Sequence, residues 1–349
     1  MTTTVLTKED IDWGNLGFDY KPTTYRFAAT YKDGAWSEGE LITSQTVQVH
    51  EGSTSLHYGQ QCFEGMKAQT AQDGRVLLFR PELNAERMRQ SCDRLSMAEV
   101  PEELFLRGVK EAVRANYSFI PPYGSGAALY IRPMLLGTGE NLGLRPAPEY
   151  EFRVFVSPVG PYYKGTGLSL IKLAVTDYDR AAPSGTGAVK VGGNYAGGFL
   201  ATKTAKELGA NEALYLDAAT RTYLEEAGSA NIVISLSGNR LITPRSPAIL
   251  PSITRRSVMQ IAKDELGMET EERPIHFMNE FSEFEEMGAC GTAAVISPVE
   301  AILHKNEWMY MKNNREGVGP VMQKLYNALT QIQKGERADP FGWTVEVEL

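Results

Sequence analysis

The chain has 349 residues, of which 42% are hydrophobic and 22% are charged, so its composition is globular and excludes a disordered or collagen-like chain. A formal net charge of −8 argues against general nucleic-acid binding and against docking on an anionic membrane, because both need a basic surface. This length favours two domains.

The first half of the chain predicts a mixed α+β domain in which the strands are antiparallel. Residues 1–24 are polar and lack a clear period, so we expect an arm there. The pair Asp33-Gly34 is typical of a hairpin turn between strands. Sequence periodicity predicts, in chain order, strands at 25–31 and 41–49, helices at 81–98 and 102–118, and strands at 127–137 and 149–159.

The second half begins after residues 160–167, a segment rich in Gly, Pro and Tyr that we interpret as an interdomain linker. The pattern then predicts a strand at 168–176, a Gly-rich loop at 183–194, a helix at 195–208, strands at 212–217, 231–238 and 241–244, and a helix at 253–266 closed by Gly267. The acidic segment 279–288 is typical of a solvated helix face, and 289–299 of a buried strand. The expected domains are therefore 1–159 and 168–349.

Targeting segments and metal sites are not expected. The first ten residues, MTTTVLTKED, are not a basic stretch that leads into an apolar run, so we expect no signal peptide. No apolar run approaches the roughly 20 residues of a membrane helix. The three cysteines and four histidines are scattered, without the paired spacings of a zinc site or a disulfide framework. We predict a soluble, cytoplasmic protein without a structural metal.

Lys190 is the first residue that could carry chemistry. It stands in GTGAVKVGGNY, and glycines on both sides indicate backbone that turns sharply or approaches a ligand. It could be an ordinary surface lysine. It could instead point into a cleft, where partial burial would lower its pKa and make its amine nucleophilic. The glycines alone do not decide between these interpretations.

Glu225 and Glu226 precede the pair Gly228-Ser229. They are either a solvated acidic pair, or one of them is a carboxylate directed at a cationic ligand atom. The turn would then place its backbone under that ligand.

The segment LPSITRRSVMQ, residues 250–260, begins a helix that Ser252 or Thr254 can cap. Free N–H groups at a helix start, together with two arginines, suit a phosphate, although most helix starts bind nothing. Thr292, in ACGTAAVISPV, is either a turn hydroxyl or a further phosphate donor.

Seven segments stand in one register between about residue 20 and residue 300: LHYGQQCFEGMKA (56–68), LFRPELNAERM (78–88), LYIRPMLLGT (129–138), VKVGGNY (189–195), YLEEAGSANI (223–232), LPSITRR (250–256) and CGTAAVISPV (290–299). In this order they resemble the branched-chain amino acid aminotransferases of the fold-type IV pyridoxal-phosphate family. FEGMKA, KVGGNY and EEAGSAN are together highly specific for it.

The resemblance implies pyridoxal 5'-phosphate as the cofactor. Lys190 matches the lysine that attaches covalently to this cofactor and shuttles a proton during the reaction. Tyr195 matches the tyrosine that binds the phenolic oxygen, and Glu226 the carboxylate that faces the pyridine nitrogen. Arg87 matches the phosphate arginine, and Arg180 matches an arginine near the phosphate.

Further matches concern the phosphate and the substrate. Ile253, Thr254 and Thr292 resemble donors to the phosphate. The residues that match the substrate pocket are Tyr58, Phe63, Tyr130, Arg132, Ala293 and Ala294. In the family, an arginine at position 132 is linked to the distal carboxylate of glutamate. Lys67 also matches, without a clear role. Some animal members carry a CxxC pair where this chain has Ala294 and Ser297, so we expect no thiol switch there.

The resemblance implies an α+β enzyme of two domains, with a smaller mixed N-terminal domain and a larger C-terminal domain that has a β-barrel-like core. It implies a homodimer in which the neighbouring subunit completes the pocket. The expected reaction moves the amino group between L-leucine, L-isoleucine or L-valine and 2-oxoglutarate, with L-glutamate and the 2-oxo acids as the other partners. Alternatives are a D-amino acid aminotransferase, an aminodeoxychorismate lyase, or a non-catalytic protein on the same scaffold.

Overall fold

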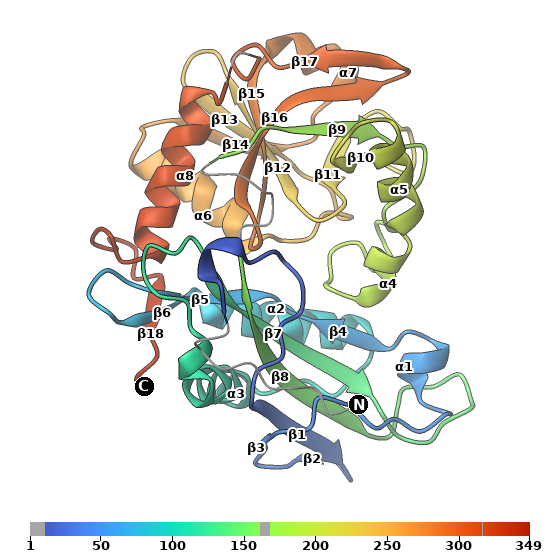
Figure 1. The fold of residues 1–349 in the computed structure, drawn as a ribbon. Coiled ribbons are helices and arrows are strands. Elements are labelled where there is room, and N and C mark those ends of the chain that lie inside the picture. The colour runs from blue at the N-terminus through green and yellow to red at the C-terminus, as the bar shows by residue number, and fades with distance from the viewer. Residues whose placement is uncertain (1–10, 161–167, 316) are drawn as a thin grey trace. The chain divides into compact units, whose positions relative to one another are not determined.

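The computed structural model describes residues 11–160, 168–315 and 317–349, which divide into two compact units. Among the described residues, unit 1 comprises 11–160, 190–192 and 331–349, and unit 2 comprises the rest. Each unit combines helices with a curled sheet (Figure 1). The α+β class is therefore confirmed.

The sheet of unit 1 is antiparallel throughout its described strands. These strands are β1 (Arg26–Lys32), β2 (Ala35–Trp36), β3 (Glu40–Ile42), β4 (Gln61–Phe63), β5 (Met66–Thr70), β6 (Val76–Phe79), β7 (Ala128–Gly137), β8 (Tyr150–Val159) and β18 (Thr344–Glu346). Their order is β18-β6-β5-β7-β8-β1-β2, with β3 beside β1 and β4 beside β7.

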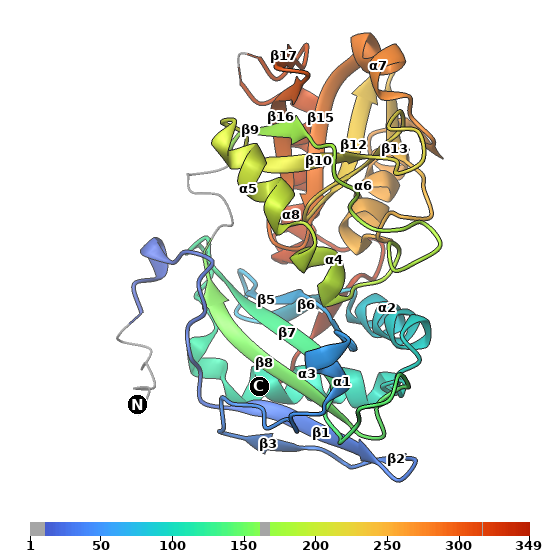
Figure 2. The ribbon, with the colours of Figure 1, turned by 90° about the vertical axis from the view of Figure 1, so that its right-hand side faces the viewer.

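Helices cover this sheet, as Figure 2 shows for α2 and α3. The described helices of unit 1 are η2 (Trp13–Asn15), α1 (Thr54–His57), α2 (Pro81–Arg94), α3 (Glu102–Ala115) and η3 (Tyr117–Phe119). Pro81 starts α2, where its missing N–H costs no hydrogen bond. Phe105 of α3 packs on Phe152 of β8, with ring centroids 5.9 Å apart, so burial of aromatic rings fixes α3 on the sheet.

The strand predicted at 41–49 is wrong beyond Ile42, where β3 ends. Arg153 of β8 donates hydrogen bonds to the carbonyl oxygens of Ser44 and Thr46. These carbonyl groups therefore accept hydrogen bonds from a side chain, whereas in a longer strand they would accept them from the backbone of a neighbouring strand.

The C-terminal tail belongs to unit 1. Its strand β18 pairs with β6, and Trp343 packs edge-on against Phe79 at 5.7 Å. The predicted domain 168–349 included this tail, which instead occupies an edge of the first sheet and covers its unpaired backbone groups. The linker predicted at 160–167 falls outside the described residues except for Gly160, and the division there stays a prediction.

The sheet of unit 2 is mixed: β9 pairs parallel with β10 and β16, and β13 pairs parallel with β14. Its described strands are β9 (Ile171–Val175), β10 (Glu212–Leu216), β11 (Leu224–Ala227), β12 (Asn231–Leu236), β13 (Arg240–Pro244), β14 (Glu269–Arg273), β15 (Phe284–Gly291), β16 (Val295–His304) and β17 (Glu307–Tyr310). Their order is β11-β10-β9-β16-β15-β12-β13-β14, with β17 beside β16.

The remaining described helices are α4 (Gly192–Ala196), α5 (Phe199–Glu207), α6 (Ile253–Asp264), α7 (Phe277–Glu280), η4 (Phe281–Glu283) and α8 (Pro320–Gln333). α5 packs on β9 and β10, and α6 packs on β12, β14 and β15. β10 and β12 are buried along their whole length, which explains their largely apolar sequence. The sheet curls into a half-barrel around this core (Figure 1).

Of the helices predicted at 195–208 and 253–266, the first needs correction and the second is confirmed. The helix predicted at 195–208 is divided into α4 and α5 at Gly197-Gly198, where two adjacent glycines weaken a continuous helix. The helix predicted at 253–266 is α6, and Gly267 follows it with a left-handed φ of 60°.

The acidic segment 279–288 is not a solvated helix face. Most of it is η4 and the buried strand β15. Within it Glu286 is fully buried, and its carboxylate accepts the backbone N–H groups of Val321 and Met322 at 3.0 and 2.8 Å. A strand side chain thus caps the start of α8, where N–H groups have no partner in their own helix.

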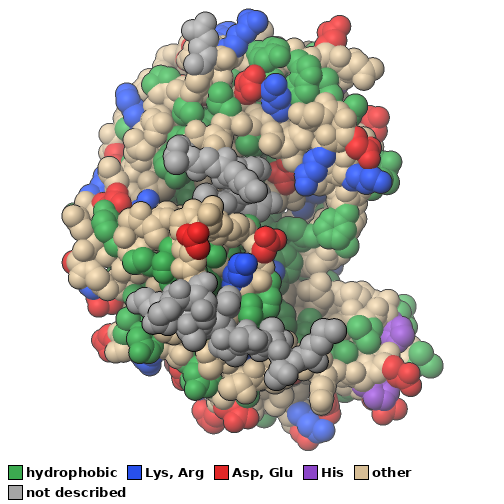
Figure 3. All heavy atoms as spheres, viewed as in Figure 1, with side chains coloured by type: hydrophobic (Ala, Val, Ile, Leu, Met, Phe, Trp, Pro, Cys, Tyr) green, Lys and Arg blue, Asp and Glu red, His purple; other side chains and the backbone are tan. Residues whose placement is uncertain are grey.

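The surface in Figure 3 mixes Lys and Arg with Asp and Glu, without an extended basic area on that face. Among the described residues, every helix is too short or too polar to cross a membrane.

We predict that Glu286→Ala lowers the free energy of unfolding by about 2–3 kcal/mol, because it leaves buried N–H groups at the start of α8 without an acceptor. Urea denaturation measures this change. Glu285→Ala is the matched control: the neighbouring side chain is only partly buried, and we expect a loss within about 0.5 kcal/mol. Equal losses in the two variants would contradict the capping role.

Candidate active site

Lys190 lies in unit 1, although its neighbours Val189 and Gly193 belong to unit 2. Its backbone N–H donates to the hydroxyl of Ser91 at 3.0 Å, and its carbonyl oxygen accepts the N–H of Phe63 at 3.1 Å. Its Nζ lies 4.9 Å from the centroid of the Phe63 ring. The lysine backbone is therefore fixed on α2 and β4, and its amine lies over an aromatic face.

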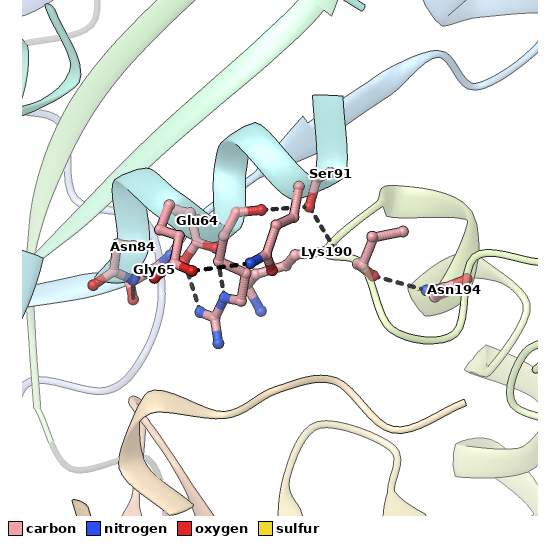
Figure 4. Close-up of polar contacts among 10 residues, drawn as sticks. Glu64, Gly65, Asn84, Ser91, Lys190 and Asn194 are labelled. Carbon is pink, nitrogen blue, oxygen red and sulfur yellow. Dashed lines mark hydrogen bonds and ion pairs between the residues drawn. The ribbon is translucent and has the colours of Figure 1, made fainter. Parts of the chain in front are cut away.

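Arg87, on α2, lies in a buried ion pair with Glu64. Figure 4 shows Glu64 beside Asn84 of the same helix. Nε and Nη2 of Arg87 donate to the two carboxylate oxygens at 2.7 and 2.8 Å, and Asn84 donates to the same carboxylate at 2.7 Å. The exposed fractions of the two side chains are 7% and 0%. This bidentate geometry holds the guanidinium plane in one orientation.

Three predicted substrate residues share one face of the unit 1 sheet. Tyr130 and Arg132 alternate along β7 and so point to the same side, and Phe63 lies opposite Met134 on that side. The guanidinium of Arg132 lies 4.8 Å from the Phe63 ring centroid, and it donates to the Tyr130 hydroxyl at 3.4 Å. The result is an aromatic and cationic surface.

Gly65 and Lys67 lie next to Tyr130, and Tyr58 lies elsewhere in unit 1. Gly65 lies directly against the Tyr130 hydroxyl, so any side chain there would collide with it. Lys67 pairs with Tyr130 across the sheet, and its pKa is lowered to about 8, chiefly by burial and then by the charge of Lys334. Tyr58 is half exposed, and its hydroxyl donates to the carbonyl oxygen of Leu142. Its hydroxyl partner therefore differs from the residue that contacts Phe63, which is Arg132.

In unit 2, the carboxylate of Glu226 is buried on β11 among donors. Its Oε1 lies 2.9 Å from Nε of Arg180 and accepts the N–H of Leu250 at 3.2 Å. Its Oε2 accepts the side-chain amide of Asn231 at 2.6 Å. The exposed fraction of the Glu226 side chain is only 5%, so this carboxylate has exchanged water for protein donors.

The adjacent Glu225 faces another set of partners, as alternation along a strand requires. It accepts the hydroxyl of Ser246 at 2.7 Å. Burial raises the pKa of its carboxyl group, while the bond from Ser246 opposes this shift. The idea of a solvated acidic pair is therefore wrong, because Glu225 and Glu226 are both buried.

The predicted phosphate donors Ile253 and Thr254 begin α6, and both are buried. The hydroxyl of Ser252 caps this helix by accepting the N–H of Arg255 at 3.2 Å. The N–H groups of the first helical turn point out of the helix end, as an anion site requires.

Thr292, Ala293 and Ala294 form the turn between β15 and β16, and all three are partly exposed. Val295 follows with a φ of 65°, which is rare for a β-branched residue. Such strain is typical of turns that are shaped for a ligand.

Tyr195 lies on α4, next to a buried side chain that organises the Gly-rich loop. Asn194 donates to the carbonyl groups of Thr186 and Val189 at 2.6 and 3.1 Å and accepts the hydroxyl of Thr186 at 2.7 Å. These bonds close the loop that leads into Lys190.

Comparison with known proteins supplies the family. Residues 61–302 match the family described as amino-transferase class IV. The chain is 53% identical to the branched-chain-amino-acid aminotransferase of Haemophilus influenzae over 345 residues, which cover 97% of this chain and 100% of that protein. The chain belongs to the branched-chain aminotransferases of class IV.

Two solved structures have the same fold as this enzyme. The branched-chain amino acid aminotransferase of Escherichia coli matches with a TM-score of 0.77 and 25% identity, covering 93% of this chain and 99% of that one. The branched-chain aminotransferase of the archaeon Thermoproteus uzoniensis, solved with norvaline, matches with a TM-score of 0.76 and 27% identity, covering 92% and 100% of the two chains.

The side chains of this aminotransferase fit pyridoxal phosphate, the cofactor of its class. A buried guanidinium at Arg87 and the start of α6 are donors that suit a phosphate dianion. A buried carboxylate at Glu226 suits a protonated pyridine nitrogen, and the Lys190 amine suits an aldehyde.

Sequence reasoning missed several residues that orient these groups. Glu64 and Asn231 stand inside the motifs FEGMKA and EEAGSAN, and their spacing gave no sign that they bind Arg87 and Glu226. Asn84 precedes Arg87 by three residues and Ser91 follows it by four, so helical spacing could have placed all three on one face.

We predict that Glu64→Leu destabilises the protein without added cofactor by about 3–5 kcal/mol, because Arg87 loses the carboxylate that compensates its buried charge. The double variant Glu64→Leu/Arg87→Met removes both charges and should recover most of this loss. Urea denaturation of both variants gives the comparison. A double variant less stable than the single one would contradict a buried ion pair.

Proposed function

We propose that this enzyme transfers the amino group reversibly between L-leucine, L-isoleucine or L-valine and 2-oxoglutarate, using pyridoxal 5'-phosphate. The observation that carries the proposal is the arrangement of Lys190, whose backbone is held at both its N–H and its C=O while its amine extends over Phe63. The identity to the Haemophilus influenzae enzyme over nearly the whole chain supports this specificity.

Pyridoxal phosphate, when bound, supplies an aldehyde that accepts an amino group and a cationic ring that withdraws electrons from the substrate's α-carbon. Lys190 would hold the cofactor covalently until the amino acid takes its place. Its freed Nζ would then carry a proton away from the α-carbon of the substrate and return one in the reverse direction. One amine would thus be attachment point and general base in turn.

Glu226 would keep a proton on the pyridine nitrogen. Its carboxylate is already oriented by Arg180 and Asn231, so it need not reorganise during the reaction. Tyr195 would donate to the phenolic oxygen. The phosphate role predicted for Arg180 stays a prediction, and in the structure this arginine is the ion-pair partner of Glu226.

Arg87 would hold the phosphate through its guanidinium, whose orientation Glu64 sets. Ile253 and Thr254 would add donors from the start of α6, and Thr292 a hydroxyl. A dianion held by a buried cation and a helix start gains both Coulomb energy and hydrogen bonds.

Phe63 and Tyr130 would contact an aliphatic side chain, and Arg132 would bind the distal carboxylate of glutamate. Their joint face offers both chemistries within a few ångströms, since Arg132 lies 4.8 Å from the Phe63 ring centroid. One pocket could therefore serve leucine and glutamate in turn. Tyr58 would line the outer part, and the Ala293-Ala294 turn would offer backbone N–H groups to the α-carboxylate.

The visible spectrum of the purified protein tests this function. With pyridoxal phosphate, we expect a yellow protein that bleaches with L-leucine, recovers with 2-oxoglutarate and ignores D-alanine. A response to D-alanine alone would indicate a D-amino acid aminotransferase. Release of pyruvate from aminodeoxychorismate without an oxo acid would indicate a lyase.

Lys190→Ala is the control in the same assay. It removes the amine that is attached to the cofactor and moves the proton, so turnover should fall by several orders of magnitude, with an unchanged melting temperature. Full turnover in this variant would refute the proposed role of Lys190. The fall should exceed the roughly 100- to 10,000-fold that general base catalysis alone contributes.

We also propose a homodimer. Leu142 and Leu144 are 82% and 89% exposed in unit 1, and the Leu142 carbonyl binds the Tyr58 hydroxyl. Leucines so exposed beside a predicted pocket residue suit burial by a second copy of the chain. Light scattering should therefore give about twice the chain mass of 38.5 kDa, and the single-chain mass at micromolar concentration would contradict the dimer. A cytoplasmic location stays a prediction.

A further inference from the structure

The backbone of Lys190 has no place in a regular helix or strand. Only Lys190–Gly192 enter unit 1, and the chain on either side belongs to unit 2. Two adjacent glycines, Gly192 and Gly193, begin α4 and have no side chain that could hold the segment in place. Local sequence therefore does not fix the position from which the amine extends, so contacts with other elements must do so.

Ser91 provides one of those contacts. Its side chain is completely buried on α2. Its hydroxyl donates to the carbonyl oxygen of Arg87, one turn earlier, at 3.0 Å. A hydroxyl has one proton, so a lone pair remains for the N–H of Lys190, which lies 3.0 Å away. Figure 4 shows Ser91 between the helix and Lys190.

The helix that holds Lys190 also carries the arginine expected to bind phosphate. Asn84, Arg87 and Ser91 occur at spacings of three and four, so they lie on one face of α2. Glu64 orients Arg87 through its side chain, and Ser91 is bonded to the backbone of Arg87. One rigid helix therefore sets both the guanidinium and the starting point of the lysine side chain.

We infer that Ser91 is a positioning residue for Lys190: it fixes the backbone from which the lysine amine extends, relative to the arginine expected to bind phosphate. This inference rests on the proposed function. Its consequence is kinetic, because a displacement of about 1 Å at a reacting group can slow a reaction by about 100-fold. Substrate binding depends on other residues, so a misplaced amine should lower kcat and leave KM nearly unchanged.

The test compares Ser91→Ala with Ser91→Thr, which keeps the hydroxyl, and with Thr330→Val. Thr330 is the matched control: it is a buried hydroxyl that donates to the carbonyl of Tyr326, four residues earlier on α8. Its loss removes the same kind of bond from a different helix.

The first readout is hydrogen exchange at the Lys190 amide in protein without cofactor. Ser91→Ala removes the acceptor of this amide, so exchange should accelerate by at least about tenfold, while Ser91→Thr and Thr330→Val leave it unchanged. An unchanged exchange rate at the Lys190 amide in Ser91→Ala would overturn the inference. This measurement does not depend on enzymatic activity.

The second readout is steady-state kinetics with L-leucine and 2-oxoglutarate. We expect Ser91→Ala to lower kcat by about 10- to 100-fold, with KM within about twofold and partial recovery in Ser91→Thr. Faster amide exchange with unchanged kcat would overturn the positioning role alone. Wild-type protein that does not respond to L-leucine would refute the proposed function, and the exchange experiment would still decide whether Ser91 holds Lys190.

Discussion

The ion pair between Glu64 and Arg87 is the interaction on which the site in unit 1 depends. The Arg87 guanidinium is only 7% exposed, and a buried carboxylate compensates its charge in a bidentate arrangement. The pair also joins α2 to the chain between β4 and β5. Since Ser91 extends from the same helix to Lys190, the orientation of the arginine and the position of the lysine follow from one set of contacts.

Unit 2 also contains a buried carboxylate whose charge is compensated by protein donors. Glu226 is buried with Arg180, Asn231 and the N–H of Leu250 around it, so its negative charge is met before any ligand arrives. A carboxylate held in this way offers a fixed electrostatic partner to a cationic ring, and it need not be reoriented by the ligand. Both units thus place a buried carboxylate beside an arginine, and both use an asparagine as a further donor.

The sequence was sufficient wherever local pattern determines structure. Strands β7 and β8 and helices α2 and α6 follow their hydrophobic periods within a few residues. Recognisable motifs also predicted Lys190 and Glu226 as site residues, and their chemical roles stay predictions. The helix predicted at 195–208 failed for a local reason, the pair Gly197-Gly198, whereas the failures at 41–49 and 279–288 share a cause: the partner lies far away in the sequence. Glu286 seemed solvated because its pattern contains no sign of α8, whose N–H groups it caps 35 and 36 residues later.

Sequence reasoning misses Ser91 for the same reason. A serine inside a helix gives no sign that its hydroxyl accepts a hydrogen bond from a backbone amide 99 residues later. The contact matters because the backbone and the side chain of Lys190 differ in mobility. Its backbone is held at two points, whereas its side chain is a flexible stem of four carbons. The proposed reaction needs the same amine first as an attachment point and then as a base. A fixed origin with a mobile stem lets the amine leave one position and return to it in each half-reaction, so the accuracy of proton transfer depends on how firmly the lysine backbone is held.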